Sequence, residues 1–333
     1  MAALSQAARR ILKMSVPVAP ETADGATATT MAQQTSNPNQ FWSRVLVVIP
    51  TLSARQAASV KALERQFRGA GAHVVVVANG RSALNALRSD ELKAVTRERN
   101  LGFAAAVNLG RATCESPIDW VLLVNDDVSI DNLSPFDALV GRGAEPIIVS
   151  FGPEPSRPIP GIAGTLAALA MIPLGRFRSR DPIDALFTLP RGKYTAFSVV
   201  AVQRELWDRL GGLDERFPFM YEDADFARRA EQMGAERLAL HVPAQIRHAR
   251  GVAGRSNVRT VFPAVTWSAL QYLQKWGMGG FAARVTCVVG LLIRVPLLPL
   301  SRAPLGEHLR AVFGAMAVVV GLRRASLPRF EDA

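Results

Sequence analysis

Two aspartates stand side by side directly after an apolar run of the sequence. The run Trp120–Val124 is followed by Asn125, Asp126 and Asp127. Adjacent carboxylates repel each other unless a cation shares them, and Mg²⁺ and Mn²⁺ prefer oxygen ligands. The pattern indicates a divalent-metal site that would hold a diphosphate. Ordinary turn chemistry is the alternative, because Asn and Asp are also common where strands end.

A second acidic cluster, Glu222, Asp223 and Asp225, lies about 100 residues further along the chain. The sequence predicts a helix that begins near Glu222 and ends at Met233, before Gly234. Acids in a first helical turn are favoured by the helix dipole alone. A carboxylate placed there beside a pocket would also be able to take the proton from an attacking hydroxyl. These residues by themselves leave both interpretations open.

Two further features have a chemical and a structural interpretation. His248 follows a predicted short strand, and a neutral imidazole there would complete a metal site with Asp127, although a lone histidine is often structural. Asn100 has the character of a helix cap, and Gly102 allows the backbone to approach a phosphate or a nucleoside. The stretch matches neither the Gly-x-Gly-x-x-Gly fingerprint nor a Walker loop. A packed alanine-rich helix over Phe103–Ala112 is the alternative.

The segments that position these residues alternate between strands and helices. Buried strands are predicted at residues 45–50, 73–77 and 120–124, and helices at 57–71 and 103–112. This alternation predicts a parallel α/β sheet, whose ligands bind at the carboxyl ends of the strands, where Asn79 and Asp127 fall. Residues 141–192 are rich in Pro and Gly and are predicted to be mainly loops. Further strands are expected at residues 147–151, 166–172 and 196–202.

The two ends of the chain differ from this central part. Residues 1–42 have no apolar periodicity and are predicted to be a disordered or loosely ordered tail, which leaves 43–256 as one domain. Residues 257–333 form a basic, apolar extension. Its apolar runs are interrupted or only 12 residues long, short of the ~20 that a spanning helix needs. They predict helices that lie in a membrane interface, with a pair of core helices as the alternative.

The charge and the cysteine content limit which binding partners and which cellular compartment are expected. The formal net charge is +11, and residues 245–333 contain 12 Lys and Arg against 3 acids. This excess predicts an anionic partner, and an acidic lipid surface is favoured over nucleic acid because the basic residues are not interleaved with aromatic ones. Cys114 and Cys287 are too far apart for a zinc motif or a disulfide framework. With no apolar run behind Arg9 and Arg10, a cytoplasmic protein is expected.

The order of these motifs resembles that of the family 2 inverting glycosyltransferases. The similarity covers about residues 44–256 and is greatest to the rhamnosyltransferase and galactofuranosyltransferase branch, which builds bacterial cell-envelope polysaccharides. It rests on Thr51 after the first strand, Asn79 and Gly80 after the second, Asn100 to Ala104 with Asn108 and Gly110, Asn125 to Asp127, Gly211 to Phe217, Tyr221 to Phe226, Arg228, Arg229, Gly234, Pro243 and His248.

The resemblance implies a GT-A fold, which is Rossmann-like with a mostly parallel central sheet, and a nucleotide-diphosphate sugar donor. Asp127 matches the last acid of the family's Asp-x-Asp motif and would hold Mg²⁺ or Mn²⁺ with His248, while Asp126 assists. The remaining donor-side residues would fall in the nucleoside-binding loops. These are Thr51, Asn79, Asn100 and Gly102.

On the acceptor side the resemblance implies that Asp223 is the catalytic base and that Glu222 and Asp225 shape the acceptor site. The predicted reaction is inverting transfer of a sugar to a hydroxyl of a lipid-linked or cell-envelope polysaccharide. The expected location is peripheral, on the inner face of the plasma membrane, and the oligomeric state is left open.

One position departs from the family pattern. Ala78 stands where the family usually has an aspartate that contacts the base, so the nucleobase preference is open. This change suggests one alternative, a catalytically impaired, glycosyltransferase-like binding protein. The other alternative is a metal-dependent nucleotidyltransferase. That class would be expected to have a Gly-rich loop after the first strand, where this chain has Pro50, Thr51, Leu52 and Ser53.

Overall fold

The computed structural model describes residues 38–87, 94–142, 145–170, 181–249, 258–300, 304–325 and 327. The chain divides into Met1–Thr35 and Ser36–Ala333, and all described residues lie in the second unit. Most of the predicted tail and the predicted boundary at 256 therefore lie outside the described residues. The last residue of the predicted tail, Trp42, ends helix α1 (Pro38–Trp42) and is buried against the rings of Phe67 and Phe136. It belongs to the folded unit.

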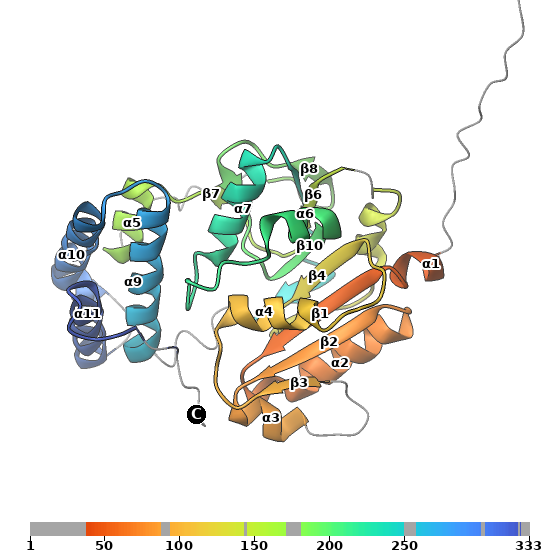
Figure 1. The fold of residues 1–333 in the computed structure, drawn as a ribbon, viewed down its shortest axis with the longest axis horizontal. Coiled ribbons are helices and arrows are strands. Elements are labelled where there is room, and N and C mark those ends of the chain that lie inside the picture. The colour runs from red at the N-terminus through yellow and green to blue at the C-terminus, as the bar shows by residue number, and fades with distance from the viewer. Residues whose placement is uncertain are drawn as a thin grey trace, which may run out of the picture. The chain divides into compact units, whose positions relative to one another are not determined.

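An eight-stranded sheet forms the centre of this unit, in the order β3-β2-β1-β4-β10-β6-β11-β8 (Figure 1). The pairs β1–β2, β1–β4, β2–β3 and β6–β11 are parallel, whereas β10 is antiparallel to both neighbours and β8 is antiparallel to β11. The strands are β1 (Val45–Thr51), β2 (His73–Asn79), β3 (Ala94–Arg97), β4 (Trp120–Val124), β6 (Ile147–Ser150), β8 (Leu186–Thr188), β10 (Val199–Gln203) and β11 (Glu236–Leu240). The predicted α/β class with a mostly parallel central sheet is confirmed.

Side chains of the central strands alternate between two hydrophobic cores, which explains why these strands are apolar throughout. In β1, Val47 and Ile49 face a first core with α2 (Ala57–Gly69) and α3 (Arg81–Leu87). Leu46 and Val48 face a second core with α4 (Phe103–Ala112), α6 (Arg204–Leu210) and α7 (Glu222–Gln232). Helix α4 lies close to the sheet at Gly110, where an added Cβ would come within 2.6 Å of Val48 Cγ1.

Two pairs of short strands and a mid-chain helix complete the frame. Strand β5 (Val128–Ile130) pairs with β12 (Ile246–His248), and β7 (Arg157–Pro158) pairs with β9 (Lys193–Tyr194). The strand predicted at residues 166–172 is wrong, because Ile162–Leu169 form helix α5. The part of this helix that overlaps the predicted strand, residues 166–169, contains only Leu and Ala, so its propensity favours a helix. Short 3₁₀ turns occur at Ala54–Gln56, Ser134–Leu139 and Leu298–Leu300.

The C-terminal helices form a third core with α5 and the start of α7. They are α9 (Val258–Lys275), α10 (Gly280–Leu297) and α11 (Leu305–Val319), which Figure 1 shows grouped with α5. Tyr272 of α9 packs against Tyr221, with ring centroids 5.2 Å apart. The inner faces of α9, α10 and α11 therefore belong to a hydrophobic core, as the alternative interpretation of these segments as core helices predicted. Within the described ranges, α10 is the one helix long and apolar enough to cross a membrane, by length and composition alone.

A buried cluster of charges ties α9 to the second acidic motif. Lys275 Nζ lies 2.6 Å from Asp225 Oδ1 and 2.7 Å from Asp214 Oδ2. Arg216 also binds Asp214, and Trp276 Nε1 donates to Asp225 Oδ1 at 3.1 Å. Burial alone would raise the pKa of Asp214, but the hydrogen bonds from Arg216 and Lys275 outweigh it, so this pKa is below its ordinary value.

We expect Asp214→Asn to lower the free energy of unfolding at pH 7 by about 1 kcal/mol, because the ion pair with Lys275 is lost. A carboxylate with a lowered pKa stabilises the fold above its unfolded pKa, about 4, and this contribution disappears as the pH falls. The difference between variant and parent should therefore shrink toward pH 2.5 in urea unfolding. Asp137→Asn, at an exposed position, is the control. A difference in unfolding free energy that does not depend on pH would contradict the assignment of Asp214 as the ionised partner of Lys275.

Candidate active site

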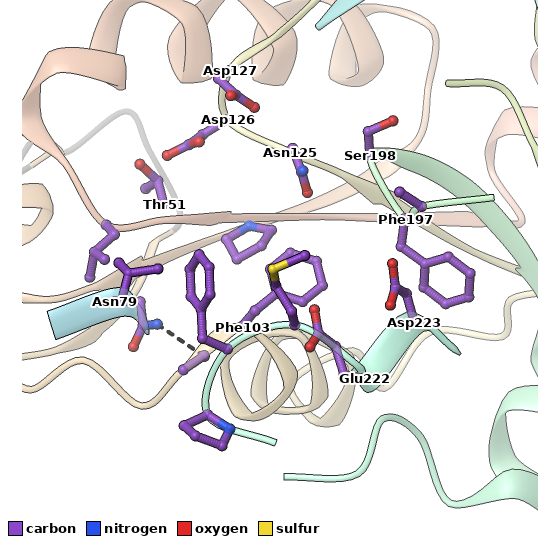
Figure 2. Close-up of a pocket in the computed structure, with 18 of the residues that line it drawn as sticks. Thr51, Asn79, Phe103, Asn125, Asp126, Asp127, Phe197, Ser198, Glu222 and Asp223 are labelled. Carbon is purple, nitrogen blue, oxygen red and sulfur yellow. Dashed lines mark hydrogen bonds between the residues drawn. The ribbon is translucent and has the colours of Figure 1, made fainter. Parts of the chain in front are cut away.

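A cleft of about 490 Å³ opens where β1, β2 and β4 end, at the edge of the sheet that the sequence predicted. Residues of both acidic clusters line it, and Figure 2 shows Asp126 and Asp127 across the cavity from Glu222 and Asp223. Its lining comprises Pro50, Thr51, Leu52, Asn79, Asn100, Gly102, Phe103, Asn125, Asp126, Asp127, Arg157, Ala196, Phe197, Ser198, Pro218, Phe219, Met220, Glu222, Asp223, His248 and Val261.

One end of the cleft is a chain of acidic and basic side chains. Strand β12 pairs with β5 so that His248 lies opposite Val128, next to Asp127. His248 Nε2 is 2.8 Å from Asp127 Oδ1, and its Nδ1 is 2.5 Å from Glu154 Oε1. Burial alone would lower the pKa of His248, but the two carboxylates raise it to about 9. Without a bound ion the imidazole is therefore a cation that faces both carboxylates, and an ion on Nε2 would take the place of the proton there.

The neighbouring acids respond differently to burial. Burial raises the pKa of Asp126 to about 6, and the Asp127 carboxylate adds to this rise. Burial also acts to raise the pKa of Glu154, but hydrogen bonds from His248 and Ser198 outweigh it and lower this pKa. The His248 cation therefore offsets the negative charge of the neighbouring carboxylates at this end of the cleft.

The donor atoms at this end fit a divalent ion that shares its shell with a substrate. Asp127 and His248 present an oxygen and a nitrogen, and the buried Asn125 Oδ1 has no hydrogen-bond partner in the described part of the chain. No group of three or more His, Cys, Asp or Glu side chains in the described ranges is arranged to enclose an ion. Mg²⁺ and Mn²⁺ commonly take one or two protein ligands and complete the shell with phosphates and water.

A hydrogen-bonded loop before α4 builds a further wall of the cleft. Asn79 Nδ2 donates to Asn100 Oδ1 and to Gly102 O, both at 3.1 Å, and Asn79 Oδ1 accepts from Leu101 N at 2.8 Å. Figure 2 draws one hydrogen bond of Asn79 as a dashed line. The amide of Asn79 is thus used within the protein, where it fixes the loop before α4. Thr51 ends β1 in the cleft, beside Asp126.

At this wall the cap of α4 differs from the one predicted, and the position of Ala78 becomes clear. Asn100 is not the cap of α4; the N-cap is Gly102, whose φ of 87° suits glycine, and Asn100 Oδ1 accepts from Gly102 N at 2.8 Å. Ala78 is fully buried in the first core and is absent from the cleft lining. Its small side chain therefore leaves no gap in the cleft.

The first turn of α7 presents the second acidic pair. Met220 and Tyr221 both have positive φ, 64° and 74°, and this sharp turn directs Glu222 and Asp223 into the cleft. Asp223 Oδ2 accepts from Arg157 Nη2 at 3.2 Å and Oδ1 from Ala224 N at 2.7 Å. Both oxygens are thereby oriented.

Glu222 is in a different electrostatic state from its neighbour. Its side chain is buried, and its Oε2 has no hydrogen-bond partner among the described residues. Burial first, and the charge of Asp223 second, raise the pKa of Glu222 to about 8, against the opposing effect of Arg157. At neutral pH Glu222 therefore keeps its proton.

Asp225, predicted to shape the acceptor site, does not line the cleft. It is fully buried, and its carboxylate binds Arg229 Nε at 2.7 Å as well as Lys275 and Trp276. One helical position after Ala224, its side chain leaves the helix on the side that faces α9. It contributes to the structure by anchoring α7, and the acceptor role is not supported by its position.

Sequence reasoning missed Glu154 and Arg157. Both belong to the Pro- and Gly-rich segment that was predicted to be mainly loops, so no periodicity marked them. Arg157 lies on β7, with its guanidinium carbon 4.9 Å from the centre of the Tyr194 ring. The available signal was two charged residues within a loop otherwise made of Gly, Pro and Ser. Loops placed on a rigid sheet often carry function.

Comparisons with known proteins give structural neighbours only. No protein-family model and no curated protein sequence matches the chain. Glucosyl-3-phosphoglycerate synthase from Mycobacterium tuberculosis, solved with Mn²⁺, UDP and phosphoglyceric acid, is 14% identical, with a TM-score of 0.39 over 69% of this chain and 81% of that one. The catalytic domain of Drosophila β1,4-galactosyltransferase 7 with xylobiose is 12% identical, with a TM-score of 0.38 over 63% and 72%. An inositol-1-phosphate CTP transferase from T. maritima is 11% identical, with a TM-score of 0.30 over 60% and 90%.

These neighbours include both sugar transferases and a nucleotide transferase. At these identities and TM-scores they do not establish a family or an activity for the chain, so its chemistry has to be argued from the cleft itself.

Proposed function

We propose that the protein is a metal-dependent inverting glycosyltransferase that moves a sugar from a nucleotide-diphosphate donor to a hydroxyl. The observation that carries this proposal is one cleft with Asp127, paired with His248, at one wall and Asp223, oriented by Arg157, at the other. Transfer by a single displacement needs these two groups on opposite sides of the reacting carbon. The GT-A fold and the rhamnosyltransferase-like assignment belong to the same proposal.

The donor would lie along the sheet edge. Asp127 and His248, with Asp126 beside them, would hold the divalent ion and the diphosphate. A divalent ion, when bound, offsets the negative charge that grows on the leaving phosphate. Phe103 and Pro218 give the cleft an apolar wall for the nucleoside, and Asn79 keeps the loop beside it in place.

The acceptor hydroxyl would approach from the side of α7. Its oxygen forms a bond to the anomeric carbon as the bond from that carbon to the phosphate oxygen breaks, and its proton passes to Asp223. Attack from the face opposite the diphosphate inverts the configuration. Arg157 keeps Asp223 oriented, and Glu222, protonated at neutral pH, would donate a hydrogen bond to the acceptor.

We expect Asp223→Asn to lower turnover by ~10²–10⁴-fold, because the amide cannot take the proton. The measurement is release of nucleoside diphosphate from a panel of nucleotide sugars, with Mn²⁺ and candidate acceptors, and Asp137→Asn serves as control. Turnover within threefold of the parent would exclude Asp223 as the base. Release of pyrophosphate from nucleoside triphosphates would instead support a nucleotidyltransferase.

A second prediction separates Glu222 from Asp223. Glutamine resembles a protonated glutamate, so Glu222→Gln should keep turnover within about tenfold at pH 7, in contrast to Asp223→Asn. Parent activity should fall as the pH rises through about 8, where Glu222 ionises beside Asp223 despite Arg157. The variant should lack this alkaline limb in a pH–rate profile. An unchanged limb would show that another group titrates there.

We propose further that the acceptor is lipid-linked or bound to the cell envelope, and that α10 rests on the anionic inner surface of the plasma membrane. Exposed apolar residues recur every three or four positions on one side of α10, at Phe281, Val285, Val289 and Leu292. Phe281 is 83% exposed. Such spacing places these side chains on one helix face.

The surroundings of this face suit an acidic lipid surface. Glu307 is the one acidic residue between positions 258 and 325, whereas Arg310, Arg323 and Arg324 are exposed near the same helices. Basic residues near an anionic leaflet contribute ~1 kcal/mol each. The other side of α10 packs on α5, α9 and α11, so a helix lying in the interface fits better than one crossing the bilayer alone.

Substitutions on this exposed face of α10 test the proposed membrane contact without removing helices of the core. Phe281→Glu combined with Leu292→Glu should reduce flotation with phosphatidylglycerol vesicles by at least tenfold, because two charges would replace apolar side chains that contact the lipid. Ile183→Glu, at another exposed apolar position (65%), should not. Vesicles of phosphatidylcholine alone should bind the parent weakly. Equal flotation of parent and double variant would contradict the proposed face.

A further inference from the structure

Glu154 is the partly buried centre of a hydrogen-bond chain behind the candidate metal site. Its side chain is 14% exposed, and Oε1 meets His248 Nδ1 at 2.5 Å. The same ring reaches Asp127 through Nε2, at 2.8 Å. One imidazole therefore connects the acid of the cleft with an acid behind it.

The second oxygen of Glu154 connects to the sheet. Glu154 Oε2 accepts a short hydrogen bond from Ser198 Oγ, and Ser198 O accepts from Asn125 N at 2.9 Å. Glu154 is thus tied both to the residue before β10 and, through it, to the Asn125–Asp127 segment. Its carboxylate cannot turn without breaking one of the two bonds.

The backbone before Glu154 is shaped to allow this contact. An added Cβ at Gly152 would collide with Ser198 Oγ and with the Glu154 carboxylate. Gly152 O is in turn bound by His241 Nδ1 at 3.0 Å, which fixes the loop from the other side. The loop is therefore built around the carboxylate of Glu154.

The position of this carboxylate decides which ring proton His248 keeps once an ion displaces the other. If Nδ1–H donates to Glu154, the lone pair of Nε2 is available to a cation beside Asp127. Without Glu154, a neutral ring is free to keep its proton on Nε2, where it would donate to Asp127 and block a metal bond. A carboxylate behind a ligating histidine orients the ring and raises its basicity.

We infer that Glu154 is a positioning residue that holds His248 with Nε2 directed to the cation shared with Asp127. The inference rests on the proposed metal-dependent function and adds a residue to it. Asp127 and His248 would contact the ion, and Glu154 would act through the ring.

Direct Mn²⁺ binding to the full chain, without substrate, tests the role apart from activity. The free Mn²⁺ signal in electron paramagnetic resonance gives the Kd of parent, Glu154→Ala, Glu154→Gln and the control Glu205→Ala, which is exposed on α6. We expect Glu154→Ala to raise the Kd by ~10–100-fold and the control to leave it unchanged. Glu154→Gln keeps an oxygen that can accept from Nδ1–H, so it should raise the Kd less.

The outcomes separate this inference from the function it rests on. If the parent binds no Mn²⁺, both the metal in the proposed function and the inference fail. If the parent binds and both Glu154 variants bind equally well, the inference alone is overturned. Melting temperatures without metal show whether a variant is folded. Should Glu154→Ala not fold, the nearly isosteric Glu154→Gln decides, since a Kd equal to that of the parent would contradict the role.

Discussion

Negative charge gathered in a partly buried cleft is the constraint on which the rest of this structure depends. Asp126, Asp127, Glu154, Glu222 and Asp223 lie in or just behind the same cavity, and burying a carboxylate without compensation is costly. The fold meets this cost in different ways. A histidine cation stands between Asp127 and Glu154, an arginine binds Asp223, and Glu222 keeps its proton. The two walls of the cleft thus differ in how their carboxyl groups are compensated, and the proposed function assigns the metal to one wall and the base to the other.

The helices that follow the sheet hold the second wall in place. Met220 and Tyr221 adopt left-handed backbone conformations that cost about 1–3 kcal/mol each for residues other than glycine. Such a turn persists only where its surroundings fix it. Tyr221 packs on Tyr272 of α9, and Asp225 of α7 is bound by Lys275 at the end of α9. The C-terminal helices therefore belong to the architecture of the cleft, even though they lie beyond the sheet.

The sequence was informative where the pattern is local and less so where contacts are distant. Buried strands before Thr51, Asn79 and Asn125 were predictable because their apolar residues are continuous, and the parallel order follows from the helices between them. The helix at residues 162–169 was mistaken for a strand, since a short apolar run fits either structure. Glu154 was not predictable, because its role arises from His248, 94 positions later in the chain.

Asp225 shows why a motif alone does not assign a role. It lies two positions after Asp223 on the same helix, yet an α-helix turns by about 200° over two residues, so the two side chains leave on opposite sides. Asp223 reaches the cleft, and Asp225 reaches Arg229, Lys275 and Trp276. The acidic motif thus combines a residue that faces the cleft with one that fastens the helix. Both need a carboxylate, for different physical reasons, and only the tertiary contacts separate them.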